Sequence, residues 1–152
     1  MSTTEDERDA AHRAPAGTPD AVVDAVGAIT AAFEVVEHAR GMLYAFHRLT
    51  GRADAELSEA LDQLEAAGHP ELADELRAEV VGRNVLDGRW TFQVVEEYDD
   101  GYWSVFRDLE EQARDELVQG RRHLFEAGMK ERERTRGHHA HTARPSTSTD
   151  DL

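Results

Sequence analysis

The sequence contains no cysteine, which excludes disulfide bonds, thiolate metal sites and cysteine nucleophiles. It also has no apolar run near the roughly 20 residues that a membrane-spanning helix needs. Its N-terminus lacks the basic and then apolar stretch of a secretory leader. We therefore expect a soluble, cytoplasmic protein with no membrane partner.

Basic residues are scarce beside acidic ones, with 17 Lys+Arg against 32 Asp+Glu and a formal net charge of −15. A surface that neutralises phosphates needs clustered Lys and Arg, so we do not expect nucleic acid to be a partner. Lys130 is the only lysine. A carboxylate-rich, lysine-poor surface is also typical of halophilic adaptation, because it stays hydrated when salt screens its charges.

The two ends of the sequence lack periodic apolar residues. Residues 1–19 hold two of the four prolines, and residues 138–152 are rich in His, Ser and Thr. Neither segment buries enough apolar surface to offset the entropy of ordering it. The 152-residue length suits one domain. We predict disordered tails over 1–19 and 138–152 and a single helical domain over 20–137.

Apolar residues recur at helical spacing through the middle of the chain, and no segment sustains the alternation of a strand. Pro19 predicts a helix start and Gly51 a helix stop, and Gly120 or Gly128 favours a later bend. The predicted fold is all-α, a helical bundle in which two long helices (about 20–50 and 91–136) pack against two short ones (about 54–67 and 70–82).

The end of the second long helix is predicted to extend beyond the bundle. It carries Leu124, Phe125 and Met129, and these side chains would need a partner there. We therefore expect a homodimer or another homo-oligomer.

Opposite charges interrupt the apolar stripes of the two long helices. The segment that begins at Phe33 aligns with the one that begins at Phe92, and the alignment sets Arg40 opposite Asp99. Burying either charge alone would cost several kcal/mol, so we predict a buried pair, formed directly or through a shared ligand. His47 follows on the same stripe as Arg40. We interpret these three polar residues as groups that fix the helix register.

Carboxylates and imidazoles on the long helices suggest a second interpretation, a metal site. The arrangement resembles ferritin-like di-iron bundles in architecture only, because no histidine here follows a Glu by three residues. Hard or borderline cations accept carboxylate and imidazole ligands. In this alternative, a divalent transition metal is bound by Glu34, His38, Glu96 and Asp100.

Aromatic and basic residues concentrate between positions 83 and 103. Rings with polar tips beside arginines suit a surface that binds a protein or an anionic small molecule. They equally suit rings that close the bundle end under arginine side chains. The candidate binding residues are Arg83, Asn84, Arg89, Trp90, Tyr98, Tyr102 and Trp103.

The sequence carries no nucleophile elbow, no phosphate-binding glycine loop and no His-Glu-x-x-His motif. We therefore assign no catalytic residue and no cofactor. The leading hypothesis is a non-catalytic acidic helical protein that acts by association with an unknown protein or by binding a small molecule. The alternative is a metal-binding helical bundle with redox or hydrolytic activity.

Overall fold

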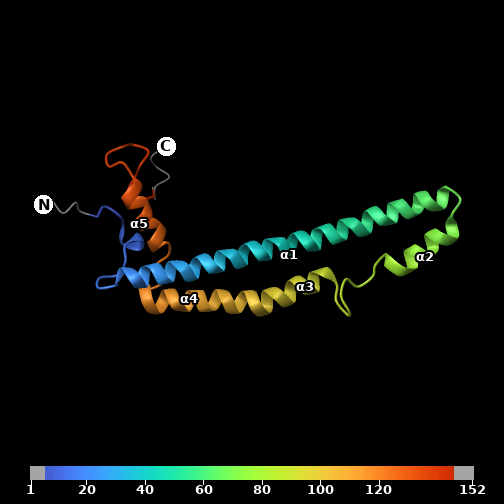
Figure 1. Cartoon of the computed structure of the whole chain (residues 1–152), viewed down its shortest axis with the longest axis horizontal. Helices are drawn as coiled ribbons and strands as arrows, with labels where there is room; N and C mark the ends of the chain where they lie inside the picture. Colours follow the sequence, from blue (N-terminus) through green and yellow to red (C-terminus); the bar gives the residue numbers. More distant parts are fainter. Residues whose placement is uncertain (1–5, 146–152) are drawn as a thin grey trace. The chain divides into compact units, whose positions relative to one another are not determined.

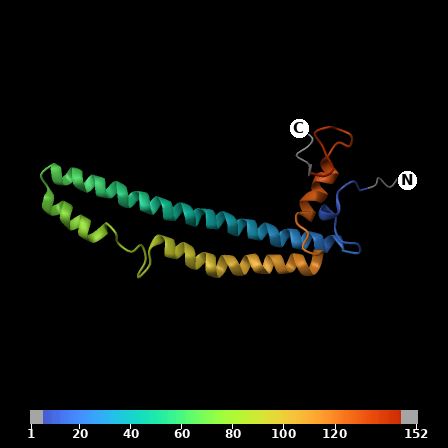
Figure 2. The same ribbon diagram turned by 180° about the vertical axis from the view of Figure 1, so that it is seen from behind.

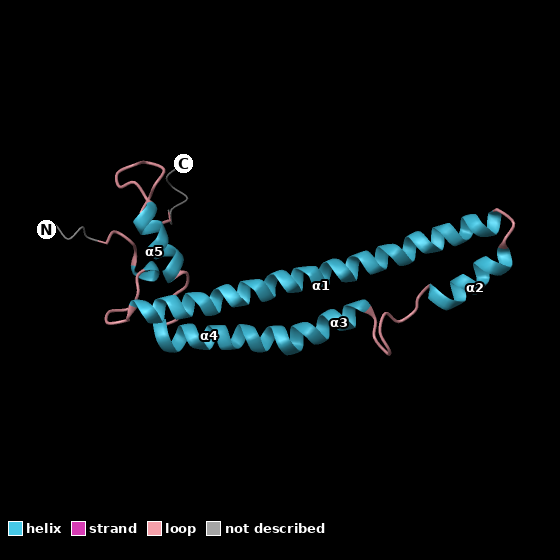
Figure 3. Ribbon diagram, viewed as in Figure 1, coloured by secondary structure: helices cyan, strands magenta, loops and turns pink. Residues whose placement is uncertain are grey.

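The structure is a computed structural model that describes residues 6–145. Over these residues it is all-α, as predicted, and has no strand beyond an isolated bridge between Leu86 and Arg89 (Figure 3). No helix among them is both long and apolar enough to cross a membrane. The chain clusters into two compact units where the sequence predicted a single domain. Unit 1 comprises Met1–Glu34 and Phe106–Leu152, and unit 2 comprises Val35–Val105.

Seven helical elements follow one another along the described residues. The longest is α1, which contributes its first part to unit 1 and the rest to unit 2 (Figure 1). The elements are a 3-10 turn (Ala10–His12), α1 (Asp20–Ala66), α2 (Pro70–Val80), α3 (Thr91–Tyr98), a π-helical turn (Asp99–Trp103), α4 (Ser104–Val118) and α5 (Leu124–Glu133).

Helix α1 runs through Gly51, where the sequence predicted a stop, so the separate helix over 54–67 does not exist. An interior glycine costs a helix about 1 kcal/mol relative to alanine. Beyond it, Arg52 and Glu56 form an ion pair at 2.9 Å across one helical turn, and Leu61 is buried. Such contacts offset the cost of one glycine, so the helix continues.

The predicted helix over 91–136 is wrong in its second half, because α4 ends at Val118. The chain then turns through left-handed backbone at Gln119 (φ 58°), Gly120 (φ 71°) and His123 (φ 56°). Glycine adopts this conformation without a steric penalty, so the turn lies where the sequence predicted only a bend. Helix α5 starts anew at Leu124.

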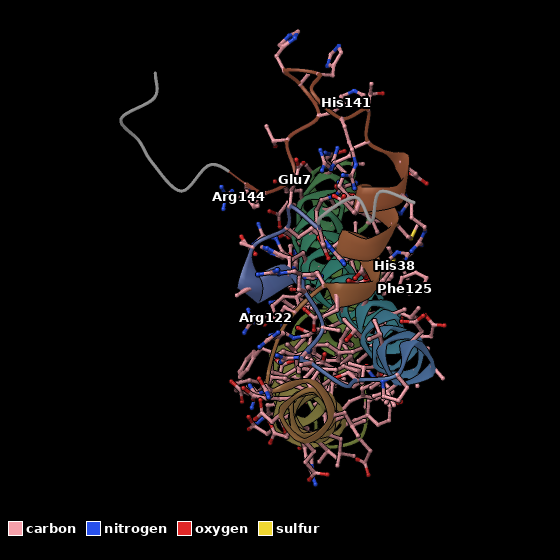
Figure 4. All side chains as sticks on the ribbon, turned by 90° about the vertical axis from the view of Figure 1, so that its left-hand side faces the viewer. Glu7, His38, Arg122, Phe125, His141 and Arg144 are labelled. Carbon is pink, nitrogen blue, oxygen red and sulfur yellow. The ribbon has the colours of Figure 1, made fainter. Side chains whose placement is uncertain are left out.

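The sequence predicted that Leu124 extends beyond the bundle, and this prediction is wrong, because α5 packs against the other helices of unit 1 and buries Leu124. Leu124 forms the core of this unit with Val26 and Val118, and Ala14 packs against the same cluster. Phe125 closes on α1 over Gly27, where a Cβ atom would lie only 2.9 Å from the Cβ of Phe125 (Figure 4). Leu124 and Phe125, which the sequence expected to contact a second copy, therefore find part of their contacts within the same chain.

The N-terminal segment is also packed where the sequence predicted a tail. Over residues 6–19, Pro15 is buried, Arg121 donates a hydrogen bond to the backbone oxygen of Arg13 at 2.7 Å, and Glu7 pairs with Arg134. At the other end, His138 and His141 have their ring centroids 4.4 Å apart. The remaining parts of the two predicted tails, residues 1–5 and 146–152, lie outside the described residues.

In unit 2, α3 lies beside the middle of α1 in both views of the ribbon (Figures 1 and 2). Few side chains of this unit are buried, and the buried ones are Val36, Leu61, Ala73 and Val95. Asp54 of α1 accepts a hydrogen bond from the backbone N–H of Gly82 at 3.0 Å, beyond the end of α2. Many of the large apolar side chains of unit 2 are exposed.

Candidate functional site

The π-helical turn after α3 is the least regular point of the helices in unit 2. The backbone N–H of Ser104 donates to the oxygen of Asp99, five residues back, where an α-helix would use the residue four back. Single π-helical turns inside α-helices are frequent at functional sites. This turn brings Asp99 and Trp103 to one side chain of α1, Arg40.

Arg40 binds both carboxylate oxygens of Asp99. Its Nε donates to Oδ1 at 2.7 Å and its Nη2 donates to Oδ2 at 2.9 Å. The guanidinium carbon also lies 4.3 Å from the ring centroid of Trp103 and 5.2 Å from that of Tyr44. A planar guanidinium suits both a forked carboxylate contact and aromatic faces, which an ammonium group does not match.

The surrounding groups extend this contact into a network. Tyr44 donates its hydroxyl to Asp99 Oδ2 at 3.3 Å, and Trp103 Nε1 donates to Glu37. We call Glu37, Arg40, Tyr44, Asp99 and Trp103 the Arg40 clasp. Its members come from α1 and from the π-helical turn, so the clasp fastens these two elements together.

The clasp shifts the protonation of its charged pair. Hydrogen bonds from Arg40 hold the pKa of Asp99 below its usual value, and the positive charge of Arg40 and a hydrogen bond from the Tyr44 hydroxyl act in the same direction. The hydrogen bond to Asp99 likewise raises the pKa of Arg40. Both groups are therefore ionised at neutral pH, and each satisfies the other.

The Arg40–Asp99 pair that the sequence predicted is present, but it does not lie in a dry core. The two side chains keep 28% and 20% of their surface exposed. His47 does not join the clasp. Its Nδ1 lies 2.7 Å from the hydroxyl of Thr91, the first residue of α3. The three polar residues thus hold α1 to two successive segments, and all three are half-buried.

The residues of the alternative metal site do not meet as a ligand set. Among residues 6–145, no group of three or more Asp, Glu or His side chains is placed to hold a metal ion. Glu34, His38, Glu96 and Asp100 are all exposed. Sharing a helix face, as Glu34 and His38 do, is insufficient when no other element brings ligands to that face.

The residues predicted to bind a partner fall into separate contacts. Arg83 pairs with Glu79 at 3.6 Å, and Arg89 pairs with Glu97 at 2.5 Å. Asn84 is exposed. The rings of Trp90 and Phe92 meet edge to face at 5.3 Å, those of Tyr98 and Tyr102 lie 5.8 Å apart, and Trp103 belongs to the clasp. Because each arginine already has a carboxylate partner, the structure adds no support for an anion site there.

Sequence reasoning missed a second charged cluster, in unit 1. Arg114 Nε donates to Glu110 Oε1 at 2.8 Å, Thr30 of α1 donates to the same oxygen at 2.7 Å, and Arg114 Nη1 donates to the backbone oxygen of Gly120 at 3.1 Å. Burial raises the pKa of Glu110, but the bonds from Arg114 and Thr30 outweigh it, so the pKa is lowered. The four-residue spacing of Glu110 and Arg114 was a usable signal.

A third cluster had no signal in the sequence. Arg134, just beyond α5, is almost fully buried, with 2% of its side chain exposed, and pairs with Glu131 at 2.6 Å and with Glu7. Its partner Glu7 lies 127 positions away along the chain. No periodic pattern links residues so far apart, so only the tertiary structure brings them together.

Helix α1 also carries an exposed apolar stripe that the sequence analysis did not separate from the stripe that faces α3. The exposed fractions are 70% for Val35, 59% for Met42, 44% for Phe46 and 59% for Leu49. At 100° per residue, this stripe lies about 120° around the helix from the one that contains Arg40. We call the following residues, all exposed, the α1 seam: Val35, Ala39, Met42, Phe46, Leu49 and Ala53.

The chain matches no family model, no curated protein and no solved structure. The residues and their geometry therefore carry the functional argument.

Proposed function

We propose that this protein is a non-catalytic helical protein that acts by association, and that the α1 seam pairs with the seam of a second copy. The exposure of four large apolar side chains along one helix is the observation that carries the proposal. Alternating steps of four and three residues are the pattern of a coiled-coil interface. A contiguous apolar patch of this kind is typical of a protein interaction site.

The order of large and small residues along the seam favours a second copy over an unrelated partner. In an antiparallel pairing about a two-fold axis near position 44, Met42 lies opposite Phe46 of the other copy. Leu49 then lies opposite Ala39, and Val35 opposite Ala53. Each end of the seam thereby sets a large side chain against an alanine. A two-fold interface needs this kind of self-complementarity.

Light scattering during size-exclusion chromatography tests the proposal. We expect the wild-type protein to be a dimer at about 10 μM and Met42→Lys to raise the dissociation constant at least about a hundredfold. Each interface holds two copies of Met42, and burying one such side chain contributes about 1.5–3 kcal/mol. Lysine at this position would also be desolvated without a partner.

Val80→Lys is the matched control. Val80 is an apolar residue of the same unit with 47% exposure, on α2 and outside the seam. We expect this variant to remain dimeric. A wild-type protein that stays monomeric at about 100 μM would contradict the proposal, and so would two variants that dissociate equally.

Spin labels test the antiparallel arrangement, because a cysteine-free chain accepts single labelling cysteines without background. With the axis near position 44, labels at Ala45 in the two copies lie close together. Labels at Ala60 lie about 48 Å apart along the helix axis, from a rise of 1.5 Å per residue. Short distances at both positions would instead indicate parallel helices.

A further inference from the structure

Unit 1 contains a cavity of about 380 Å³ that the proposed association does not use. Three segments form it: the N-terminal segment, α5 together with the residue just before it, and residues 142–145. Arg144, on the last of these, is labelled in Figure 4. The lining residues are Arg8, His12, His123, Glu126, Ala127, Lys130, Thr142, Ala143, Arg144 and Pro145.

The charge of this lining is opposite to that of the whole chain. Arg8, Lys130 and Arg144 are cationic, and Glu126 is the only acid in the lining. The lining also contains His123 and His12, whose Nδ1 lies 2.6 Å from a carboxylate oxygen of Asp9. The formal net charge of the protein is −15. Cations gathered in a concave site raise the local concentration of anions.

Two of these cations have no partner within residues 6–145. Neither Lys130 nor Arg144 forms an ion pair or a side-chain hydrogen bond there, whereas buried Arg134 nearby in the sequence is fully engaged by Glu131 and Glu7. Arg8 uses Nε and Nη2 for Asp6, at 3.0 and 2.7 Å. Within the described residues, the cavity thus offers two positive groups that no carboxylate compensates.

Apart from Thr142, the rest of the lining is apolar. Ala127, Ala143 and Pro145 contribute carbon atoms, and the long stems of the cationic residues add methylene groups. The volume lies at the lower end of the range for small-molecule sites. It is too small for the acyl chains of a phospholipid, whereas a single ring or a short chain fits.

We propose that this cavity binds a small molecule that carries a phosphate or carboxylate on an apolar body. Lys130 and Arg144 pair with the anionic head, and the alanines and Pro145 contact the apolar body. This ligand site lies wholly in unit 1, whereas the α1 seam belongs to unit 2. A failure of one proposal therefore leaves the other standing.

Isothermal titration with phenyl phosphate in phosphate-free buffer tests this site. We expect saturable binding to the full-length protein, and an affinity about tenfold weaker for Lys130→Met and for Arg144→Met, because each loses one charge-assisted contact and keeps its apolar stem. Arg48→Met is the control, since it removes an exposed cation of unit 2. It should bind within about twofold of the wild type.

Two further probes separate the parts of the proposal. Phenol, which lacks the anion, should not bind at concentrations up to about 10 mM, and inorganic phosphate should bind more weakly than phenyl phosphate. No binding of phenyl phosphate at about 10 mM would overturn the site. Equal affinities in wild type, Lys130→Met and Arg144→Met would overturn it as well. If inorganic phosphate binds as tightly as phenyl phosphate, the apolar contact is refuted.

Discussion

The two units each contain an arginine–carboxylate pair, and the pairs differ in reach and in burial. In unit 2, Arg40 and Asp99 are 59 positions apart and keep 28% and 20% of their side chains exposed. In unit 1, Arg114 and Glu110 lie four positions apart on α4 and keep only 11% and 7% exposed. The Arg40–Asp99 pair, which is distant in sequence, is thus more exposed to solvent than the local Arg114–Glu110 pair.

This difference separates two uses of the same chemistry. The Arg40 clasp joins two elements: the guanidinium contacts two aromatic rings as well as a carboxylate that water still reaches. The Arg114 pair also binds the backbone oxygen of Gly120, so it secures the turn that lets α5 fold back. Burial sets the energetic consequence, because an uncompensated charge costs more where water cannot reach it.

The largest expected effect is that of Arg114→Met. The variant leaves Glu110 buried without its cation, and breaking a buried pair in this way costs about 3–5 kcal/mol. Urea unfolding followed by far-ultraviolet circular dichroism measures the loss. Both tryptophans and all three tyrosines lie in unit 2, so tryptophan fluorescence reports separately on that unit.

The control is the double variant Glu110→Met, Arg114→Met, which removes both charges. It should be more stable than Arg114→Met alone, since no buried charge remains. A loss below about 1 kcal/mol for Arg114→Met would show that the pair is not energetically buried.

A smaller effect is expected for Arg40→Leu, about 1–3 kcal/mol, because water partly solvates the Asp99 carboxylate that it leaves behind. Arg40→Leu with Asp99→Leu should lose less than Arg40→Leu alone. Urea midpoints from tryptophan fluorescence provide the comparison. If the double variant is the less stable of the two, the clasp does not depend on this ion pair.

The smallest effect is the pH dependence that comes from Asp99. Hydrogen bonds from Arg40, the positive charge of Arg40 and a hydrogen bond from the Tyr44 hydroxyl together lower the folded-state pKa of Asp99 below the unfolded value of 3.8. The resulting stability is complete above the unfolded pKa and is lost as the pH falls through the folded pKa. Urea unfolding followed by tryptophan fluorescence at steps from pH 6 to about pH 3 should show a shallower decline in Asp99→Asn. Identical slopes in variant and wild type would contradict this account.

Several helix starts and the central ion pair followed from local rules. Helices begin at Asp20, Pro70 and Thr91 as expected, because proline and polar residues before apolar stripes specify these starts locally. The Arg40–Asp99 pair was also accessible, since two opposite charges occupied apolar positions of two long stripes. The continuity of α1 through Gly51 was not accessible, because the helix propensity of one glycine is weak against the contacts on either side of it.

The sequence by itself determined the all-α class, through helical periodicity and the lack of sustained alternation. It also indicated the Arg40–Asp99 pair of the clasp, because charges in apolar stripes need partners. Only the tertiary structure decided that α5 folds back onto Val26 and Val118, that Glu7 reaches Arg134, and that one apolar stripe of α1 is covered while the seam stays exposed. These outcomes depend on contacts between residues far apart along the chain, and local spacing carries no information about such contacts.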